Sequence, residues 1–100
     1  MNKRLQIPTV EQFFKAVLSL ENLDECYAFF EDVCTINEIM SISQRLDVAK
    51  MLCAKRTYLD ISNETGASTA TISRVNRSLS FGNDGYQLVL DRLAEAEDAE

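Results

Sequence analysis

The sequence predicts an all-α protein. Apolar residues recur at the 3.6-residue spacing of a helix in one segment after another, and no segment shows the two-residue alternation of a strand. Residues typical of helix starts stand in front of most of these segments. The 100 residues include three glycines and one proline, and no serine- or glycine-rich run that could serve as a linker. We therefore expect a single helical domain over residues 1–100.

Two helices are expected near the amino terminus. Thr9 and Gln12 have the spacing of a capping box, in which two side chains bond free backbone N–H groups at a helix start. An apolar stripe follows, made of Val10, Phe13, Phe14, Val17 and Leu18. Asn22 and Glu25 give the same start signal for a second helix. Its stripe consists of Leu23, Cys26, Tyr27 and Phe30.

A third helix, about Ile36–Ala54, is predicted to start at a capping box of Thr35 and Glu38. Its apolar residues point nearly all round the helical wheel. They are Ile36, Ile39, Met40, Ile42, Leu46, Val48, Met51, Leu52 and Cys53. A helix that is apolar on every side must be covered on every side. Because the chain is short, we expect a second copy to supply the cover, in a homodimer.

Residues 57–80 predict two short helices joined by a tight turn. Thr57 with Asp60 can cap the first helix, and Gly66 can adopt the left-handed conformation that ends it. Ser68 can cap the second helix. A last helix is expected after a break at residues 82–85. Its first apolar residues, at helical spacing, are Tyr86, Val89, Leu90 and Leu93. The acidic tail, about residues 95–100, is expected to fray.

The second helix of this pair has two chemically different sides. Ile72, Val75 and Leu79 fall on one side, where they can pack on Ile61 of the first helix, and the small Ser62 suits a close crossing. The other side consists of Ala70, Ser73, Arg74 and Arg77, with Thr69 at its edge. This pattern is typical of a DNA-binding helix-turn-helix. Two packed bundle helices with a solvated polar side are the alternative.

Charge is distributed unevenly along the chain, whose 10 basic and 16 acidic residues give a net charge of −6. Residues 1–35 carry 3 basic and 6 acidic groups, residues 36–80 carry 6 and 4, and residues 81–100 carry 1 and 6. The three segments therefore have charges of −3, +2 and −5. Only the basic middle segment contains the predicted helix-turn-helix, which favours a nucleic-acid partner there. The acidic ends fit equally well as solubilising surfaces.

The sequence carries no signature of an enzyme, a metal site or a membrane segment. No histidine, nucleophile elbow or glycine-rich phosphate loop occurs. No CxxC spacing occurs among Cys26, Cys34 and Cys53, so we expect these three cysteines to be buried as small hydrophobic side chains. The alternative is a regulator that is gated by oxidation of a cysteine. With no run of 18 apolar residues and no secretory signal, we expect a cytoplasmic protein with no membrane partner.

Three stretches resemble the Trp repressor family, and more closely its YerC/YecD group: Thr35–Glu38, Gln44–Leu46 and Thr65–Arg74. The resemblance covers about Leu18–Leu93 and is most specific in the turn and second helix, GASTATISR. It implies an intertwined, all-helical homodimer. Docking of a helix-turn-helix in the major groove and water-mediated base contacts are described for the Trp repressor itself, so the resemblance implies these features too.

The resemblance also implies a ligand site. The best-known member of the family binds tryptophan between two arginines, and Arg45 and Arg74 match them, while Thr35 and Ser78 match further pocket residues. This chain has Val75 where the repressor has glycine, and a branched side chain takes the room of the indole ring. We therefore expect no tryptophan corepressor and no other cofactor, and the sequence leaves a small-molecule effector undetermined. An ion pair or a phosphate contact is the alternative role for the two arginines.

Together these features predict a homodimeric, sequence-specific DNA-binding regulator of transcription. We expect a repressor that reads a palindromic operator on double-stranded DNA by inserting the helix Ser68–Ser80 into the major groove. The expected phosphate contacts are Lys55, Arg56, Arg77, the backbone N–H groups at Ser68 and, at the edge, Asn76. The expected base contacts are Thr69, Ala70, Thr71, Ser73 and Arg74. The alternative from another class is a protein-interaction adaptor without direct DNA binding.

Overall fold

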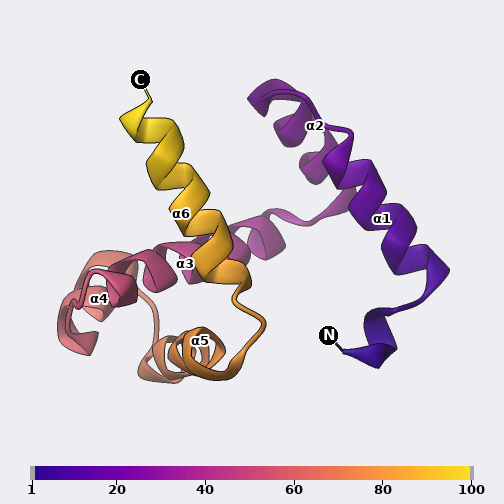
Figure 1. The fold of residues 1–100 in the computed structure, drawn as a ribbon. Coiled ribbons are helices and arrows are strands. Elements are labelled where there is room, and N and C mark those ends of the chain that lie inside the picture. Colours follow the sequence, from indigo (N-terminus) through magenta and orange to yellow (C-terminus); the bar gives the residue numbers. More distant parts are fainter. Residues whose placement is uncertain (1, 100) are drawn as a thin grey trace. The chain divides into compact units, whose positions relative to one another are not determined.

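The computed structural model describes residues 2–99, which form helices and no strand (Figure 1). The predicted all-α fold is therefore confirmed. A short 3-10 helix, η1 (Lys3–Leu5), precedes α1 (Pro8–Leu18), α2 (Leu23–Val33), α3 (Ile36–Cys53), α4 (Tyr58–Thr65), α5 (Thr69–Phe81) and α6 (Gly85–Asp98). Contacts divide the chain into two units, one up to Ile39 and one from Met40. The sequence contains no linker, so its composition indicates one unit. The boundary between the two contact-defined units falls inside α3, between Ile39 and Met40.

The first unit contains η1, α1, α2 and the start of α3. Helix α1 begins at Pro8, and the residue before it caps the helix without a side-chain hydrogen bond. The predicted capping box of Thr9 and Gln12 is therefore wrong. Proline fixes the backbone angle φ at a helical value and lacks the N–H that a cap would satisfy, so the helix starts one residue before Thr9.

Helix α2 starts as predicted. The side-chain oxygen of Asn22 accepts a hydrogen bond from the backbone N–H of Glu25 at 2.9 Å. The Glu25 carboxylate in turn accepts the N–H of Glu21 at 2.8 Å, one residue before the cap itself. Two of the backbone donors at this helix start are thus satisfied by side chains.

Aromatic rings join α1 to α2 in the first unit. The rings of Phe13 and Phe29 stack with centroids 6.1 Å apart, and Phe30 meets both rings edge-on. Even so, no residue of α1 or α2 is fully buried, and Leu18 is 82% exposed. These two helices therefore leave a large apolar surface uncovered.

Helix α3 starts on the predicted capping box and differs along its length. The backbone N–H of Thr35 donates to the Glu38 carboxylate at 2.8 Å, and the N–H of Glu38 donates to the Thr35 hydroxyl at 3.1 Å. Near this end the apolar side chains are exposed, and Ile36 is 78% exposed. Only the carboxyl-terminal half of α3 is buried, through Val48, Ala49 and Met51.

The core of the second unit is built by α3, α4, the following turn and α5. Its buried members are Val48, Ala49, Met51, Ile61, Ala67, Ile72 and Val75. Leu52, Leu79, Tyr86 and Leu90 pack against this cluster, so α6 contributes through its first turns. The predicted packing of Ile72 and Val75 with Ile61 is confirmed, because all three are at most 1% exposed.

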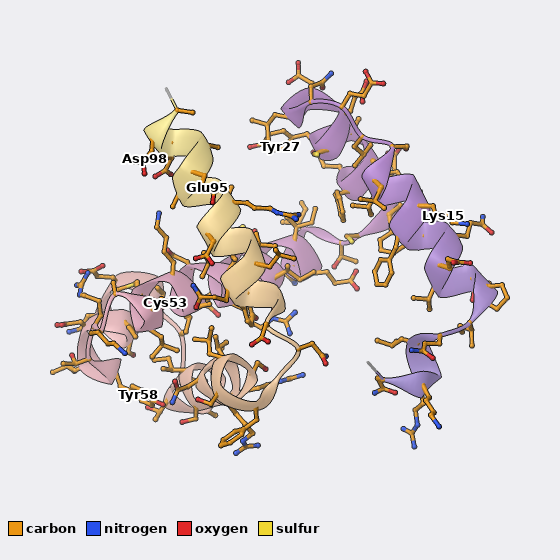
Figure 2. All side chains as sticks on the ribbon, in the orientation of Figure 1. Lys15, Tyr27, Cys53, Tyr58, Glu95 and Asp98 are labelled. Carbon is orange, nitrogen blue, oxygen red and sulfur yellow. The ribbon has the colours of Figure 1, made fainter. Side chains whose placement is uncertain are left out.

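Helix α6 extends as far as Asp98. Residues 95–98 are helical, and Figure 2 shows Glu95 and Asp98 on its last turns. Alanine and glutamate, which are strong helix formers, make up most of these last turns. Fraying of the tail stays a prediction, and residue 100 lies outside the described residues. In the loop before α6, a side-chain carbon at Gly82 would stand 2.3 Å from the Ser78 carbonyl oxygen, so only glycine fits there without a shift.

The cysteines differ from the prediction in their burial. Cys26 and Cys34 are half-buried, and Cys53, labelled in Figure 2, is exposed at the end of α3. All three are free thiols. Cys53 is the last residue of α3, and its thiol lies 3.8 Å from the side-chain oxygen of Gln87 on α6. Across residues 2–99, no helix has the length and apolar character needed to cross a membrane, and no three potential metal ligands gather together.

Candidate nucleic-acid interface

The α4–α5 pair, residues 57–81, is built on the predicted local signals. The Thr57 hydroxyl accepts the backbone N–H of Asp60 at 3.1 Å, which caps α4. Gly66 follows α4 in the left-handed conformation with φ of 75°. The Ser68 hydroxyl accepts the N–H of Thr71 at 3.2 Å, which caps α5. All three predicted signals are confirmed.

The turn between α4 and α5 is tied down by bonds that the sequence did not predict. The Thr65 hydroxyl donates to the Ile61 carbonyl at 2.6 Å and accepts the N–H of Ala67 at 3.1 Å. The Gln44 amide of α3 donates to the Thr65 carbonyl at 3.1 Å. Gln44 lies 21 residues before Thr65, so no local spacing could have indicated this contact. The turn is thereby anchored both to its own helix and to α3.

One side of α5 is buried and the other faces solvent. Ile72 and Val75 lie in the core, which fixes the rotation of the helix about its axis. Of the residues predicted to meet DNA, Ala70, Ser73, Arg74 and Arg77 lie opposite this buried side, and Thr69, Thr71 and Asn76 flank it. Thr69, Ala70, Arg74, Asn76 and Arg77 are exposed, and Thr71 and Ser73 are half-buried. The structure thus brings the predicted base-contacting residues together on one accessible surface.

The exposed side of α5 is positively charged. Neither Arg74 nor Arg77 forms an ion pair with another described residue, and α5 itself contains no acidic residue. The amino-terminal end of α5, at Ser68, adds free backbone N–H groups and the positive end of the helix dipole. An ion pair, one alternative role for Arg74, is therefore absent within the described residues.

The two basic residues before α4 have different surroundings. Lys55 is exposed and has the left-handed φ of 63°. The guanidinium of Arg56 bonds the carboxylate of Glu64, and its Nε lies 3.7 Å from a carboxylate oxygen of Asp60. The hydrogen bond that Arg56 donates to Glu64, together with the charge of that carboxylate, raises the pKa of Arg56 above its ordinary value. Sequence reasoning predicted neither of these ion pairs.

The residues matched to a ligand site have separate roles in this structure. Thr35 caps α3, and the Ser78 carbonyl accepts the N–H of Gly82 at 2.9 Å. Arg45 is half-buried on α3 and forms no ion pair with a described residue, while Arg74 is exposed. Val75, only 1% exposed, is part of the core. The side chain of Val75 thus fills space that a glycine would leave open.

A hollow of about 490 Å³ lies elsewhere in the second unit, between α3 and the end of α4. None of the residues predicted for a ligand site lines it. The lining residues are Met40, Ser41, Ser43, Gln44, Asp47, Glu64 and Thr65.

The chain is similar to known proteins along most of its length. The sequence profile described as Trp repressor protein matches residues 8–94. The uncharacterised protein YerC of Bacillus subtilis (strain 168) is 56% identical over 94 residues, which cover 94% of this chain and 90% of YerC. The crystal structure of a TrpR-like protein from Eubacterium eligens ATCC 27750 has a TM-score of 0.91 and 68% identity, covering 93% of this chain and 96% of that one. A proposed Trp repressor from Staphylococcus aureus has a TM-score of 0.89 and 55% identity, covering 92% of both chains.

Proposed function

The chain belongs to the Trp repressor family, and from this premise we propose that it is a DNA-binding regulator of transcription that acts as a repressor. The observation that carries the proposal is the exposed side of α5. It presents Arg74, Arg77 and several short polar side chains without any acid, on a helix whose other side is buried. Guanidinium and small polar groups of this kind fit the edges of bases in the major groove.

Base edges are contacted by the first turns of α5. Thr69, Ala70 and Arg74 are exposed, and the long Arg74 side chain reaches furthest from the helix, whereas Thr71 and Ser73 are half-buried and act at shorter range or through water. Arginine pairs best with guanine, and the methyl group of alanine suits that of thymine.

Phosphate contacts surround this surface. Arg77 and Asn76 are exposed one turn further along α5, and the backbone N–H groups after Ser68 point out of its amino-terminal end. Such contacts supply affinity and fix the orientation of the protein on the duplex, while base contacts supply the sequence preference.

The acting species is a homodimer. Helices α1 and α2 contain no fully buried residue, and the apolar residues near the start of α3, such as Ile36, are exposed. A unit of fewer than about 40 residues without a core does not hold together alone, so a second copy of the chain supplies the missing cover. Two copies related by a two-fold axis read a palindromic operator with half-sites about 34 to 36 Å apart.

The protein has no catalytic role and acts in the cytoplasm, where its DNA target lies. The family is one of non-enzymatic regulators, and the same membership supports the location. Val75 in the core supports a regulator that works without tryptophan. No observation assigns another effector to the protein.

Selection of bound fragments from random double-stranded DNA by the purified protein tests this function directly. We expect an enriched palindrome, bound with an affinity that falls steeply as salt rises, because each neutralised phosphate releases counterions. Recovery of no preferred sequence, together with binding that does not respond to salt, would favour the adaptor alternative.

A further inference from the structure

Lys55 occupies a backbone position that ordinarily belongs to glycine. Its N–H donates to the Leu52 carbonyl at 3.0 Å, and the N–H of Arg56 donates to the Met51 carbonyl at 3.1 Å. This pair of bonds is a Schellman motif, which ends a helix with one residue in the left-handed region. With φ of 63°, Lys55 is that residue. A side chain there costs conformational free energy that glycine avoids.

The ammonium group of Lys55 is available to a partner. Lys55 is exposed and forms no ion pair with another described residue. Lys55 stands two residues before Thr57, the residue that caps α4, so it leads directly into the α4–α5 pair. A strained position that holds an unpaired charge at the entry to the proposed DNA-binding helix pair points to a contact made by that charge.

Arg56, the next residue, is already paired with carboxylates of α4. Its guanidinium bonds Glu64 at the end of α4 and lies 3.7 Å from a carboxylate oxygen of Asp60 in the first turn of α4. The side chain therefore lies along α4 and links its entry to its last turn, next to the Gly66 turn. Two carboxylates oppose one positive charge, which leaves Arg56 little attraction for a phosphate.

We propose that Lys55 is a phosphate contact and that Arg56 is a positioning residue for the α4–α5 pair. This division of roles rests on the proposed DNA-binding function. It separates two neighbouring basic residues that look equivalent in the sequence. Removing the lysine side chain should therefore improve the fold and impair binding, whereas removing the arginine should impair both.

Lys55→Gly tests the first half. Glycine relieves the left-handed strain, so the thermal midpoint should rise by about 4 °C or more. Each lost phosphate contact makes the slope of log affinity against log salt less steep by about 0.9, or about 1.8 for the two subunits of a dimer. A variant that is more stable yet has the salt slope of the native chain would overturn the role of Lys55.

Arg56→Ala and Glu64→Gln test the second half. If Arg56 positions the pair, both variants should weaken DNA binding about two- to fivefold at every salt concentration and leave the salt slope unchanged. Their effects on the thermal midpoint should not add in the double variant, because both remove the same interaction. The opposite outcome is stronger DNA binding by Glu64→Gln together with a less steep salt slope for Arg56→Ala. That outcome would show that Arg56 contacts a phosphate and that Glu64 competes for it.

Arg92→Ala is the matched control, since it removes one positive charge from α6, outside the α4–α5 pair. It should keep the native salt slope. If the native chain binds no duplex at all, the proposed function and this inference fail together. If the native chain binds with a steep slope and Lys55→Gly keeps that slope, only the inference fails.

Discussion

Arg74 and Arg77 lie three residues apart on the exposed side of α5, but their changes should have different consequences. Arg77→Ala should weaken binding to operator and unrelated DNA alike, because a phosphate contact carries no sequence information. Arg74→Ala should lose about 1 to 3 kcal/mol of discrimination at one base pair, because the variant cannot make the bidentate contact to guanine that we propose for Arg74. Titration of both variants with operator and scrambled duplexes measures the difference.

Matched losses on the two duplexes by both variants would mean that Arg74 does not read a base. The native ratio of operator to scrambled affinity, measured at the same salt concentration, is the reference for both variants.

Val75 decides whether an aromatic ligand has room beside α5. Its side chain is 1% exposed in the core, and inserting an indole ring there would cause overpacking that typically costs about 1 to 3 kcal/mol. We expect calorimetry with millimolar tryptophan to detect no binding by the native chain, and DNA binding to be indifferent to tryptophan.

Val75→Gly opens the space while leaving Arg45 and Arg74 in place. A cavity and a helical glycine both lower stability, so thermal melting must show that this variant is folded before it is titrated. Binding by the variant alone supports the steric explanation, and binding by neither chain means that Val75 is not the sole obstacle. Tight binding by the native chain refutes the explanation.

The start of α3 should make the stability of the protein depend on pH. Two hydrogen bonds of Thr35 hold the pKa of Glu38 below its ordinary value of 4.5. The bond from the Thr35 backbone N–H has the larger effect, and the bond of the Thr35 side chain adds to it. Because the folded state favours the ionised carboxylate, its contribution to stability is present above pH 4.5 and is lost as the pH falls through the lowered pKa.

Glu38→Gln should accordingly reduce the loss of stability on acidification. Denaturant unfolding at a series of pH values from about 6 to 3 measures it in the native chain and the variant. Glu31→Gln, which alters an exposed glutamate that caps no helix, serves as the control. Identical pH profiles for the native chain and Glu38→Gln would show that the capping box contributes no pH-dependent stability.

For the whole molecule, the exposed apolar residues predict that folding and association are coupled. The thermal midpoint should rise with protein concentration, because a dimer that binds only the folded chain is favoured by mass action. Melting curves over a hundredfold range of concentration measure this rise. A monodisperse monomer in light scattering at micromolar concentration would exclude the obligate dimer.

A pair of substitutions tests whether the exposed start of α3 takes part in association. Ile36→Asp on α3 should lower the thermal midpoint and promote dissociation, because it places a charge on the exposed apolar surface that the proposed dimer would cover. Leu59→Asp on α4 changes a side chain of similar exposure outside that surface and should leave the dimer intact. Equal effects of the two changes would argue that α3 is not at the interface.

Features that depend on a few neighbouring residues could be predicted from the sequence alone. The caps at Thr57 and Ser68 and the left-handed Gly66 were all predictable, because each involves atoms no more than four positions apart. The face of α5 opposite Ile72 and Val75 followed from helical periodicity alone. Membership of the Trp repressor family was also visible in these same local motifs.

Contacts between groups that lie far apart along the chain became visible only in the folded arrangement of the helices. Arg56 bonds a carboxylate eight residues away, and Gln44 reaches a carbonyl 21 residues away, because the packing of α3 and α4 brings them together. Exposure of Cys53 likewise depends on where α3 ends and how the chain leaves it. In the sequence, Lys55 and Arg56 are two equivalent positive charges. In the folded chain, Arg56 is paired with carboxylates, whereas Lys55 forms no ion pair with a described residue. The physical reason is that a charge acts through its nearest partner in space, which local spacing does not specify.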